Sequence, residues 1–320
     1  MSSLQPHRLG WIGLGSMGLA MATNIQNYLT QHQLPPLKYW NRTISRGDSL
    51  KSIGGVPCVS PEDLVQACDI IFISLSDDDA LKAVINTLIS TSQLFSKTII
   101  DTTTVHPNTT SHISTLLSPH QASYIAAPVF GSTPVAQAGQ LLIALAGPED
   151  AITTVLPYLE GVLARGVIRV GQEQNKALLL KTTSNFITAG LMSLLSEAHV
   201  LAEISGLDAD ILHSLVSENF GPYAASVSER LISGAYCPAP GVALRSGLEL
   251  GIKDVGHGVA LARGKGWKLE VGEMYMRDAG RAKAWGDERR RRMDSSAVYG
   301  VVRERAGLDF EKGFDGKGDE

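Results

Sequence analysis

The sequence predicts an α/β fold, with an N-terminal doubly wound parallel sheet joined by a long helix to a C-terminal all-α domain. In the first half, short apolar runs alternate with stretches of helical spacing, which is the pattern of a parallel sheet covered by helices. After Gly171, apolar residues recur at helical spacing only, and no convincing strand follows. The change in pattern indicates two domains of different architecture.

The first domain is expected at residues 1–172. Its strands are predicted at residues 9–12, 37–40, 70–74, 98–101, 123–126, 141–146 and 167–170. Helices are predicted between them, and several begin with the Ser, Asp or Pro that is typical of a helix N-terminus. These helices are expected at residues 18–28, 61–67, 77–89, 107–117 and 149–164.

The second domain is expected at residues 173–308. Its first helix, at 177–204, is longer than most globular helices, so we expect it to pass through the interface between the domains. Further helices are predicted at residues 208–217, 223–233, 250–264 and 273–286. Residues 309–320 are rich in glycine and charge with little to bury, and we expect them to form a disordered tail.

Composition argues against several classes of partner. The chain has 320 residues, of which 44% are hydrophobic and 19% charged, with a net charge of −4, which is ordinary for a globular protein. The basic run at residues 289–292 is flanked by acidic residues, so we interpret it as a solvated helix face and expect no nucleic-acid partner. No segment has about 18 consecutive apolar residues, so no membrane partner is expected.

Cysteine and histidine usage points to no metal. The 3 cysteines are widely spaced, so neither a disulfide framework nor a zinc cage is encoded, and the histidines show no metal-ligand spacing. A reducing, cytoplasmic location is therefore expected. The apolar stretch at residues 11–22 contains several glycines, and we interpret it as a strand and turn rather than a targeting segment.

A glycine motif follows the first predicted strand and opens the first predicted helix. In a GxGxxG turn the first glycine makes the tight turn, the second admits a pyrophosphate, and the third lets the helix pack on the strand. Because the motif has a strand before it and a helix after it, we expect a Rossmann-type dinucleotide site. Its residues are Gly13, Leu14, Gly15, Ser16, Met17 and Gly18.

The end of the second predicted strand indicates which dinucleotide binds. NAD enzymes usually place Asp or Glu here, whereas this chain has Asn41, Arg42 and Thr43. Arg42 offers a planar donor fork for a 2′-phosphate, with Asn41 and Thr43 as neutral donors beside it. The alternative is a capping Asn-x-Thr next to a surface arginine. We favour NADP(H).

Further motifs follow the glycine motif, among them the segment from Asp101 to Pro107, the loop from Ala127 to Ser132, and Lys181 with Asn185. Their order resembles that of the β-hydroxyacid dehydrogenase family. That family includes 3-hydroxyisobutyrate dehydrogenase and the glyoxylate/succinic semialdehyde reductases, within the superfamily of the 6-phosphogluconate dehydrogenase NADP-binding domain. The resemblance covers nearly the whole chain to about residue 300. It rests on the glycine motif with Ala20-Met21, the segment from Asp101 to Pro107, the loop from Ala127 to Ser132 with Ala138 to Leu141, Lys181 with Asn185, Lys253-Asp254, and Asp294 to Val298.

The resemblance implies roles for individual residues. Leu75 and Ser76 stand where the family has a Leu-Pro that borders the cofactor, Thr104 would lie by the nicotinamide, and Lys253 would reach the cofactor. Phe130, Gly131 and Ser132 stand in the substrate loop, where the family has Ser-Gly-Gly. Because Phe130 removes a hydroxyl and adds bulk, the usual small hydroxy-acid substrate is in doubt. The family's Gly-x-Gly before the lysine is also absent here.

Lys181 and Asn185 are the predicted catalytic residues. Residues four apart lie on one face of a helix, and a lysine on an otherwise apolar helix is costly unless it is paired or useful. An ammonium can polarise a carbonyl and deliver a proton while a nicotinamide delivers hydride. The alternative is a lysine that reaches solvent beside an exposed Asn. Lys176 is the rival lysine, on a different face.

The sequence thus predicts an NADP(H)-dependent oxidoreductase that reduces an aldehyde or keto group, or oxidises the corresponding hydroxy compound. An imine reductase of the same architecture is one alternative, although such enzymes typically lack the lysine at the position of Lys181. A non-catalytic NADP-binding protein is another. The partner is expected to be a small-molecule substrate, and the apolar helix at 177–204 predicts a homodimer.

Overall fold

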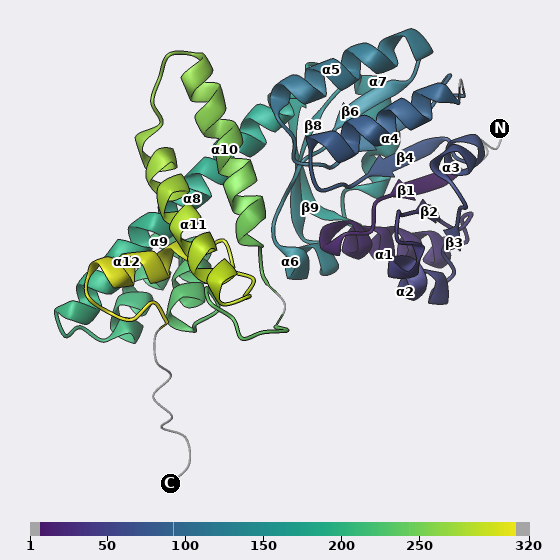
Figure 1. Cartoon of the computed structure of the whole chain (residues 1–320). Helices are drawn as coiled ribbons and strands as arrows, with labels where there is room; N and C mark the ends of the chain where they lie inside the picture. The colour runs from purple at the N-terminus through teal and green to yellow at the C-terminus, as the bar shows by residue number, and fades with distance from the viewer. Residues whose placement is uncertain (1–6, 92, 243, 312–320) are drawn as a thin grey trace. The chain divides into compact units, whose positions relative to one another are not determined.

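The structure is a computed structural model that describes residues 7–91, 93–242 and 244–311 (Figure 1). The chain divides into two compact units, and the division falls between Lys181 and Thr182. The first unit is a sheet covered by helices, and the second consists mainly of helices, which confirms the predicted fold class. The predicted boundary at residues 172 and 173 lies just before the helix within which the two units divide.

The first unit contains a sheet of nine strands among the described residues, in the order β3-β2-β1-β4-β5-β6-β8-β7, with β9 pairing to β8. Strands β1 to β6 pair in parallel, whereas β8 runs antiparallel to β6 and β7. The strands are β1 (Leu9–Ile12), β2 (Lys38–Trp40), β3 (Val56–Pro57), β4 (Ile70–Ile73), β5 (Thr98–Asp101), β6 (Ser123–Ala126), β7 (Val129–Phe130), β8 (Leu141–Ala146) and β9 (Ala164–Gly171).

Helices cover both faces of this sheet, so successive residues of the central strands enter different cores. Figure 1 shows α1 on one face of the sheet and α4 and α5 on the other. Trp11 and Phe72 stack at 5.2 Å in the core that includes residues of α1, and Ile71 and Ile73 enter the core that includes residues of α4 and α5. The helices are α1 (Ser16–Gln31), α2 (Asp48–Ser52), α3 (Pro61–Ala67), α4 (Asp78–Ser90), α5 (Pro107–Leu117), α6 (Thr133–Gln137) and α7 (Glu149–Val155).

One predicted helix is wrong in its second half. The pattern at residues 149–164 predicts a single helix, but α7 ends at Val155 and β9 begins at Ala164. Pro157 lies in the 3-10 turn that follows α7, and Gly161 has φ of +76°, a conformation that ends helical geometry. The predicted strand at 167–170 correspondingly lies within a longer one, nearer to its C-terminal end.

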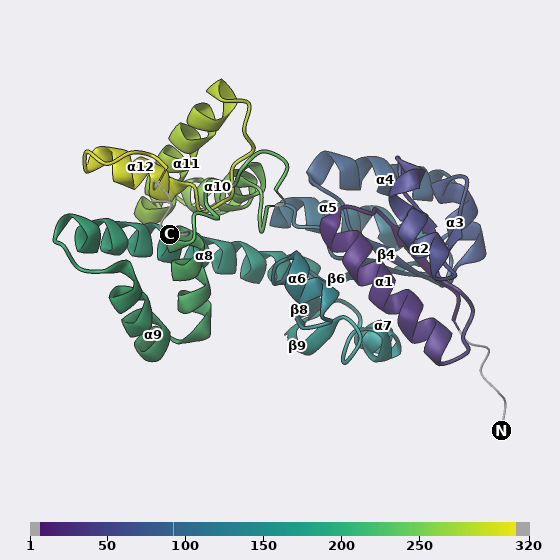
Figure 2. The ribbon, with the colours of Figure 1, turned by 90° about the horizontal axis from the view of Figure 1, so that it is seen from below.

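The second unit contains the remaining helices. They are α8 (Gln174–Ile204), which begins in the first unit, α9 (Ala209–Ile232), α10 (Leu248–Gly264), α11 (Glu270–Glu288) and α12 (Val298–Arg305). Figure 2 shows that α9 is sharply bent. The bend lies at Gly221, which has non-helical φ and ψ and precedes Pro222, so the two predicted helices at 208–217 and 223–233 are its two halves.

A buried carboxylate connects three segments of the second unit. Asp294 is fully buried, forms an ion pair with Arg230 at the end of α9, and accepts hydrogen bonds from the backbone N–H groups of Ser246 and Ser296. The segment Asp294 to Val298 therefore joins the end of α9, the loop before α10 and the start of α12. The ion pair and the hydrogen bonds of Asp294 account for a buried acid at the start of the segment from Asp294 to Val298.

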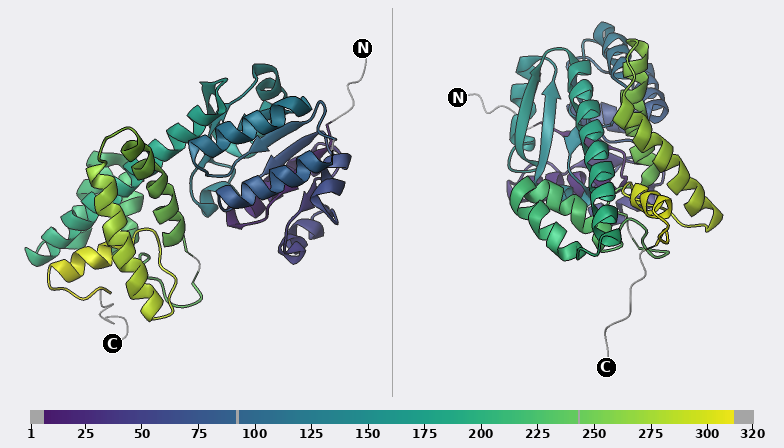
Figure 3. Two further views of the ribbon diagram at one scale, coloured as in Figure 1. Left: turned by 45° about the horizontal axis from the view of Figure 1, so that its top comes forward. Right: turned by 90° about the vertical axis from the view of Figure 1, so that its left-hand side faces the viewer.

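By length and composition, α8 alone among the described residues could cross a membrane, which the sequence analysis does not predict. Figure 3 shows α8, in teal to green, as one long helix. In its most apolar 18-residue window, 44% of the residues are buried within the structure. Because a helix that packs into a protein core meets the same criterion, this is weak evidence for a membrane partner.

Two expectations about the end of the chain need revision. The basic run is not a helix face, because residues 289–292 follow the end of α11, where Arg289 stacks on Trp285 and Arg291 binds the carbonyls of Cys237 and Pro238. Phe310 is buried against Trp285, so packed structure continues past residue 308. Residues 312–320 of the predicted tail lie outside the described residues.

Candidate functional site

The glycine loop has the geometry that a dinucleotide site requires. Gly13 has φ of +97°, which side chains disfavour, and a Cβ on Gly18 would collide with the carbonyl of Gly13. A Cβ on Gly15, in contrast, would meet nothing within 4 Å. Gly15 is the N-cap residue of α1, so no side chain caps the first N–H groups of that helix. Gly13 and Gly18 thus serve the fold, whereas Gly15 leaves open space at the N-terminus of α1. Anions commonly bind at such helix N-termini.

Asn41 fixes this loop from the end of β2. Its Oδ1 accepts from the backbone N–H of Leu14 at 2.9 Å, and its Nδ2 donates to the carbonyl of Thr43 at 2.8 Å. The observed role of Asn41 is therefore to hold the glycine loop against residues 41–43. Direct contact between Asn41 and a cofactor stays a prediction.

Arg42 and Thr43 lie on the surface beside this anchor. Both side chains are exposed, and no ion pair to Arg42 occurs within residues 7–91, 93–242 and 244–311. Ser16 is also exposed, whereas Met17 is half-buried. The guanidinium of Arg42 is thus accessible to an anionic group near the glycine loop.

Leu75, Ser76 and Thr104 lie on the loops after β4 and β5. These strands are neighbours in the sheet, and both end at the edge where β1 leads into the glycine loop. The backbone N–H of Leu75 donates to Oγ1 of Thr103 at 3.1 Å, which ties one loop to the other. Ligands of open parallel sheets bind outside this carboxyl edge, so the predicted cofactor residues lie where the fold places a site.

The predicted substrate loop leads from β7 into α6. Phe130 ends β7, Gly131 has φ of +139°, and Ser132 caps α6 without a side-chain hydrogen bond. Helix α6 packs on α1, where Asn24 donates to the carbonyl of Ala136 at 2.8 Å. Because α1 begins at the glycine loop, the substrate loop and the cofactor loop belong to one packed arrangement.

Lys181 lies against the substrate loop. Its Nζ is 5.1 Å from the centroid of the Phe130 ring, within the range of a cation–π interaction. Both residues are partly buried and belong to the first unit. The structure therefore brings together the predicted catalytic lysine and the residue that departs most from the family pattern.

Asn185 and Lys253 share a partner in the second unit. Asn185 Nδ2 donates to Oδ2 of Asp254 at 2.9 Å, and Lys253 Nζ lies 3.0 Å from Oδ1 of the same carboxylate. Sequence reasoning identified the Lys253-Asp254 pair but missed that Asp254 also holds Asn185. No local pattern signals this contact, because it joins α8 to α10.

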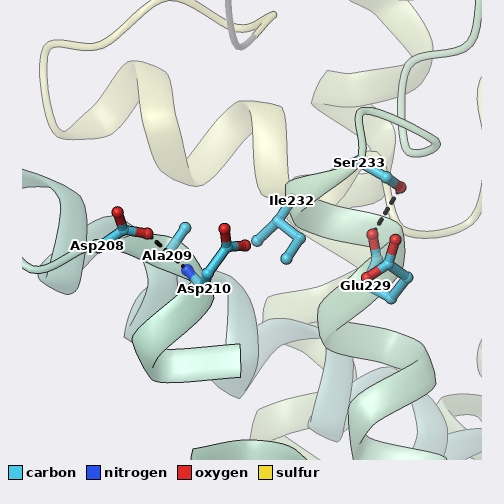
Figure 4. Close-up of a pocket in the computed structure, with 6 residues that line it drawn as sticks. All are labelled: Asp208, Ala209, Asp210, Glu229, Ile232 and Ser233. Atoms are coloured by element: carbon cyan, nitrogen blue, oxygen red, sulfur yellow. Dashed lines mark hydrogen bonds between the residues drawn. The ribbon is translucent and has the colours of Figure 1, made fainter. Parts of the chain in front are cut away.

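A pocket elsewhere in the second unit has no part in these predictions. It lies between the two ends of the bent α9 and is lined by Asp208, Ala209, Asp210, Glu229, Ile232 and Ser233 (Figure 4). Asp208 accepts from the backbone N–H of Asp210, and Ser233 donates to the carbonyl of Glu229. These contacts cap the two ends of the helix, which gives Asp208 and Ser233 a structural role.

Comparison with known families matches the first unit. Residues 8–171 match the model of the NAD-binding domain of 6-phosphogluconate dehydrogenase. The match begins just before β1 and ends with β9, so it includes the glycine loop, Arg42, Thr104 and Phe130.

Curated relatives extend the match to the second unit. The chain is 28% identical over 301 residues to an NADH-dependent oxidoreductase of Aspergillus ustus, covering 92% of this chain and 98% of the relative. It is 32% identical over 206 residues to glyoxylate/succinic semialdehyde reductase 1 of Arabidopsis thaliana, covering 64% and 69%.

Solved structures share the fold over nearly the whole length. A 3-hydroxyisobutyrate dehydrogenase of Mycobacterium tuberculosis, solved with L-serine, has a TM-score of 0.79 at 19% identity and covers 93% of this chain and 99% of its own. An imine reductase of Streptomyces aurantiacus has a TM-score of 0.61 at 21% identity, covering 91% and 98%. At these identities the likeness extends to the fold alone.

Proposed function

Because the chain belongs to the family of the NAD-binding domain of 6-phosphogluconate dehydrogenase, we propose that it is an NADP(H)-dependent hydroxy-compound dehydrogenase or carbonyl reductase. Its substrate would be a small molecule with an aldehyde or keto group, or the corresponding alcohol. The contact between Lys181 and the Phe130 loop carries the proposal, because it places an ammonium at the loop where the family resemblance expects the substrate.

Each part of the first unit has a separate task in this proposal. A bound nicotinamide dinucleotide would supply or accept the hydride. Gly13, Gly15 and Gly18 would admit its pyrophosphate, and Leu75, Ser76 and Thr104 would border it at the carboxyl edge of the sheet. Gly131 and Ser132 would offer small groups and backbone N–H donors to the substrate.

Lys181 would transfer the proton. In reduction its Nζ–H would pass to the carbonyl oxygen as hydride reaches the carbon, and in oxidation its neutral amine would take the hydroxyl proton. Asn185, one turn further along α8, would position the substrate or the lysine, and Asp254 holds its amide in place. Lys253 is proposed to contact the cofactor on the family resemblance alone.

The preference for NADP(H) rests on Arg42. An exposed guanidinium at the end of β2 can pair with a 2′-phosphate. None of Asn41, Arg42 and Thr43 carries a carboxylate, which would repel that phosphate. One relative is described as NADH-dependent, so the preference needs a direct measurement. Fluorescence titration of the wild type should give tighter binding of NADPH than of NADH, and Arg42→Asp should invert the order.

Arg46→Asp is the matched control for this titration, because Arg46 is also exposed and lies one turn further along the same segment. It should leave the wild-type preference in place. Equal affinities of the wild type for the two cofactors would refute the assignment of Arg42.

The activity itself is tested by a substrate panel. Consumption of NADPH should be measured with semialdehydes, 2-oxo acids, bulkier ketones and cyclic imines. The proposal expects turnover of carbonyl compounds. Turnover of cyclic imines alone would establish the imine-reductase alternative, and tight NADPH binding without turnover of any substrate would favour the non-catalytic one.

A further inference from the structure

A buried carboxylate lies beneath the loops of the candidate site. Asp101 is the last residue of β5, and it is 1% exposed. Burial raises its pKa to about 6, although hydrogen bonds from Thr103 and Tyr124 to the carboxylate oppose the shift. A buried acid is costly to maintain, and the proposed reaction makes no use of it.

Asp101 forms hydrogen bonds in three directions. Its Oδ1 accepts from the backbone N–H of Thr103 at 2.9 Å, and its Oδ2 accepts from the hydroxyl of Tyr124 on β6, also at 2.9 Å. Its backbone carbonyl accepts from the N–H of Ala127 at 2.7 Å. Both oxygens of the carboxylate are thus engaged, one by its own loop and the other by the neighbouring strand.

These contacts extend to a third loop. The hydroxyl of Thr103 accepts from the backbone N–H of Leu75, and Thr102 donates through both its N–H and its hydroxyl to the carbonyl of Ile73. The loops after β4, β5 and β6 are therefore hydrogen-bonded to one another through residues 101–103. The loop after β4 carries Leu75 and Ser76, and the loop after β5 carries Thr104. The short loop after β6 leads into β7, which ends at Phe130.

We propose that Asp101 is a positioning residue, whose carboxylate holds these three loops in the register that cofactor and substrate require. This inference rests on the proposed function for the identity of the loop residues. Asp101 touches neither reactant, because it is buried beneath the loops. Its hydrogen bonds would fix the positions of Leu75 and Thr104 through Thr103. They would fix the predicted substrate loop, which includes Phe130, through β6.

The surroundings of Asp101 make this position sensitive to pH. Two ionisable groups of the described chain act on it: Asp78 at the start of α4 through its charge, and Tyr124 on β6 through the hydrogen bond that its neutral hydroxyl donates. Asp78 raises the pKa of Asp101 by like-charge repulsion, and it also accepts from the backbone N–H of His106, at the end of the Thr104 loop. Because the pKa of Asp101 is raised, its protonation removes the cost of a buried charge and does not destabilise the fold as a whole. Protonation does weaken the hydrogen bonds that favour the charged form, above all the one from Thr103, so the contacts between the loops should weaken as the pH falls through about 6.

The test compares four variants by cofactor affinity, kcat and the pH dependence of both. Asp101→Ala removes both acceptors. Asp101→Asn keeps the shape and one acceptor but cannot ionise. Tyr124→Phe removes one donor from the carboxylate. Ile99→Val is the matched control, because it removes one buried methyl group from the same strand and leaves the hydrogen bonds between the loops intact.

The expected results separate positioning from simple stability. Asp101→Ala should bind the cofactor more weakly and lower kcat by about 100-fold, which is the scale of an ångström-sized misplacement, whereas Ile99→Val should stay close to wild type. The wild type should lose affinity below about pH 6, and Asp101→Asn should lack this step. Tyr124→Phe should move the step to higher pH, because the carboxylate loses a hydrogen bond that favours its charged form.

Tyr236→Phe is the control for Tyr124→Phe. It also removes a buried hydroxyl that donates a hydrogen bond, but in the second unit, and it should not move the step. If Asp101→Ala fails to fold, the pH profiles of Asp101→Asn and Tyr124→Phe decide the question.

Two outcomes would overturn the proposal. The first is that Asp101→Ala binds the cofactor as tightly and turns over as fast as Ile99→Val. The second is that Asp101→Asn still loses cofactor affinity at acid pH in the same way as the wild type. Titration with whichever nicotinamide cofactor the wild type binds needs no substrate. The role of Asp101 is therefore tested even if every carbonyl compound fails to react.

Discussion

At the scale of single residues, Phe130 has two neighbours that matter for the proposed reaction. Its ring lies against the Lys181 ammonium, and its backbone pairs with Leu142 of β8 at the edge of the sheet. A cation–π contact stabilises an ammonium by about 0.5–1 kcal/mol at an exposed site, and by more where water is excluded. The contact with Phe130 therefore stabilises an ammonium at Lys181, which is the form that the proposed reduction requires.

The same ring should determine which substrates fit. Phe130 replaces a serine of the family pattern, so we expect preference for an apolar or bulky substrate group over acids of the size of glyoxylate. Phe130→Ser should raise the rate with small semialdehydes relative to bulkier ketones, measured as the ratio of kcat/KM values. Phe95→Ser, at an exposed phenylalanine, should leave that ratio unchanged. An unchanged ratio in Phe130→Ser would exclude a role for the ring in selectivity.

At the scale of elements, the exposed apolar side chains of α8 and α9 are grouped along the helices and are not scattered singly over the surface. On α8, Ile187, Leu194 and Leu201 are 61%, 64% and 62% exposed and are spaced seven residues apart, so they lie along one stripe. On α9, Ile211 and Leu215 are also exposed, one turn apart. A stripe of this length is typical of an interface, and we propose that a second copy of the chain covers it.

The prediction that follows is a homodimer in solution. Light scattering at micromolar concentration should give twice the chain mass for the wild type, and Leu194→Glu combined with Leu201→Glu should give the monomer, because two charges would be buried in an apolar interface. Val59→Glu, at an apolar residue that is 92% exposed in the first unit, should remain dimeric. A wild type that is monomeric at this concentration would contradict the prediction.

At the scale of the whole molecule, the long regular elements were predictable from the sequence. Hydrophobic periodicity identified β1, β4, β5, β6 and β8, and α3 and α5 were predicted with their observed ends. The short elements were not predicted: β3 and β7 have 2 residues each, and α2 and α6 have 5. Such segments are too short to show a period, and tertiary contacts determine them.

The candidate site divides in the same way. The glycine loop and its turn could be predicted because the chemistry of GxGxxG is local, and Gly13 has the conformation that the motif implies. The contact of Asn41 with Leu14, and that of Asp254 with Asn185, join residues far apart in the sequence. A single sequence has no pattern for such pairs, so they required the structure.

The central claim is that Lys181 transfers the proton, and one measurement tests it most directly: kcat for NADPH-dependent carbonyl reduction by Lys181→Ala. General acid–base groups contribute roughly 10²–10⁴-fold, so kcat should fall by a factor in that range while NADPH affinity stays close to wild type. Lys176→Ala is the control, because Lys176 is exposed and pairs with Glu173, and it should retain wild-type kcat. If Lys181→Ala keeps more than about a tenth of the wild-type kcat, this lysine is not the proton donor and the account is contradicted.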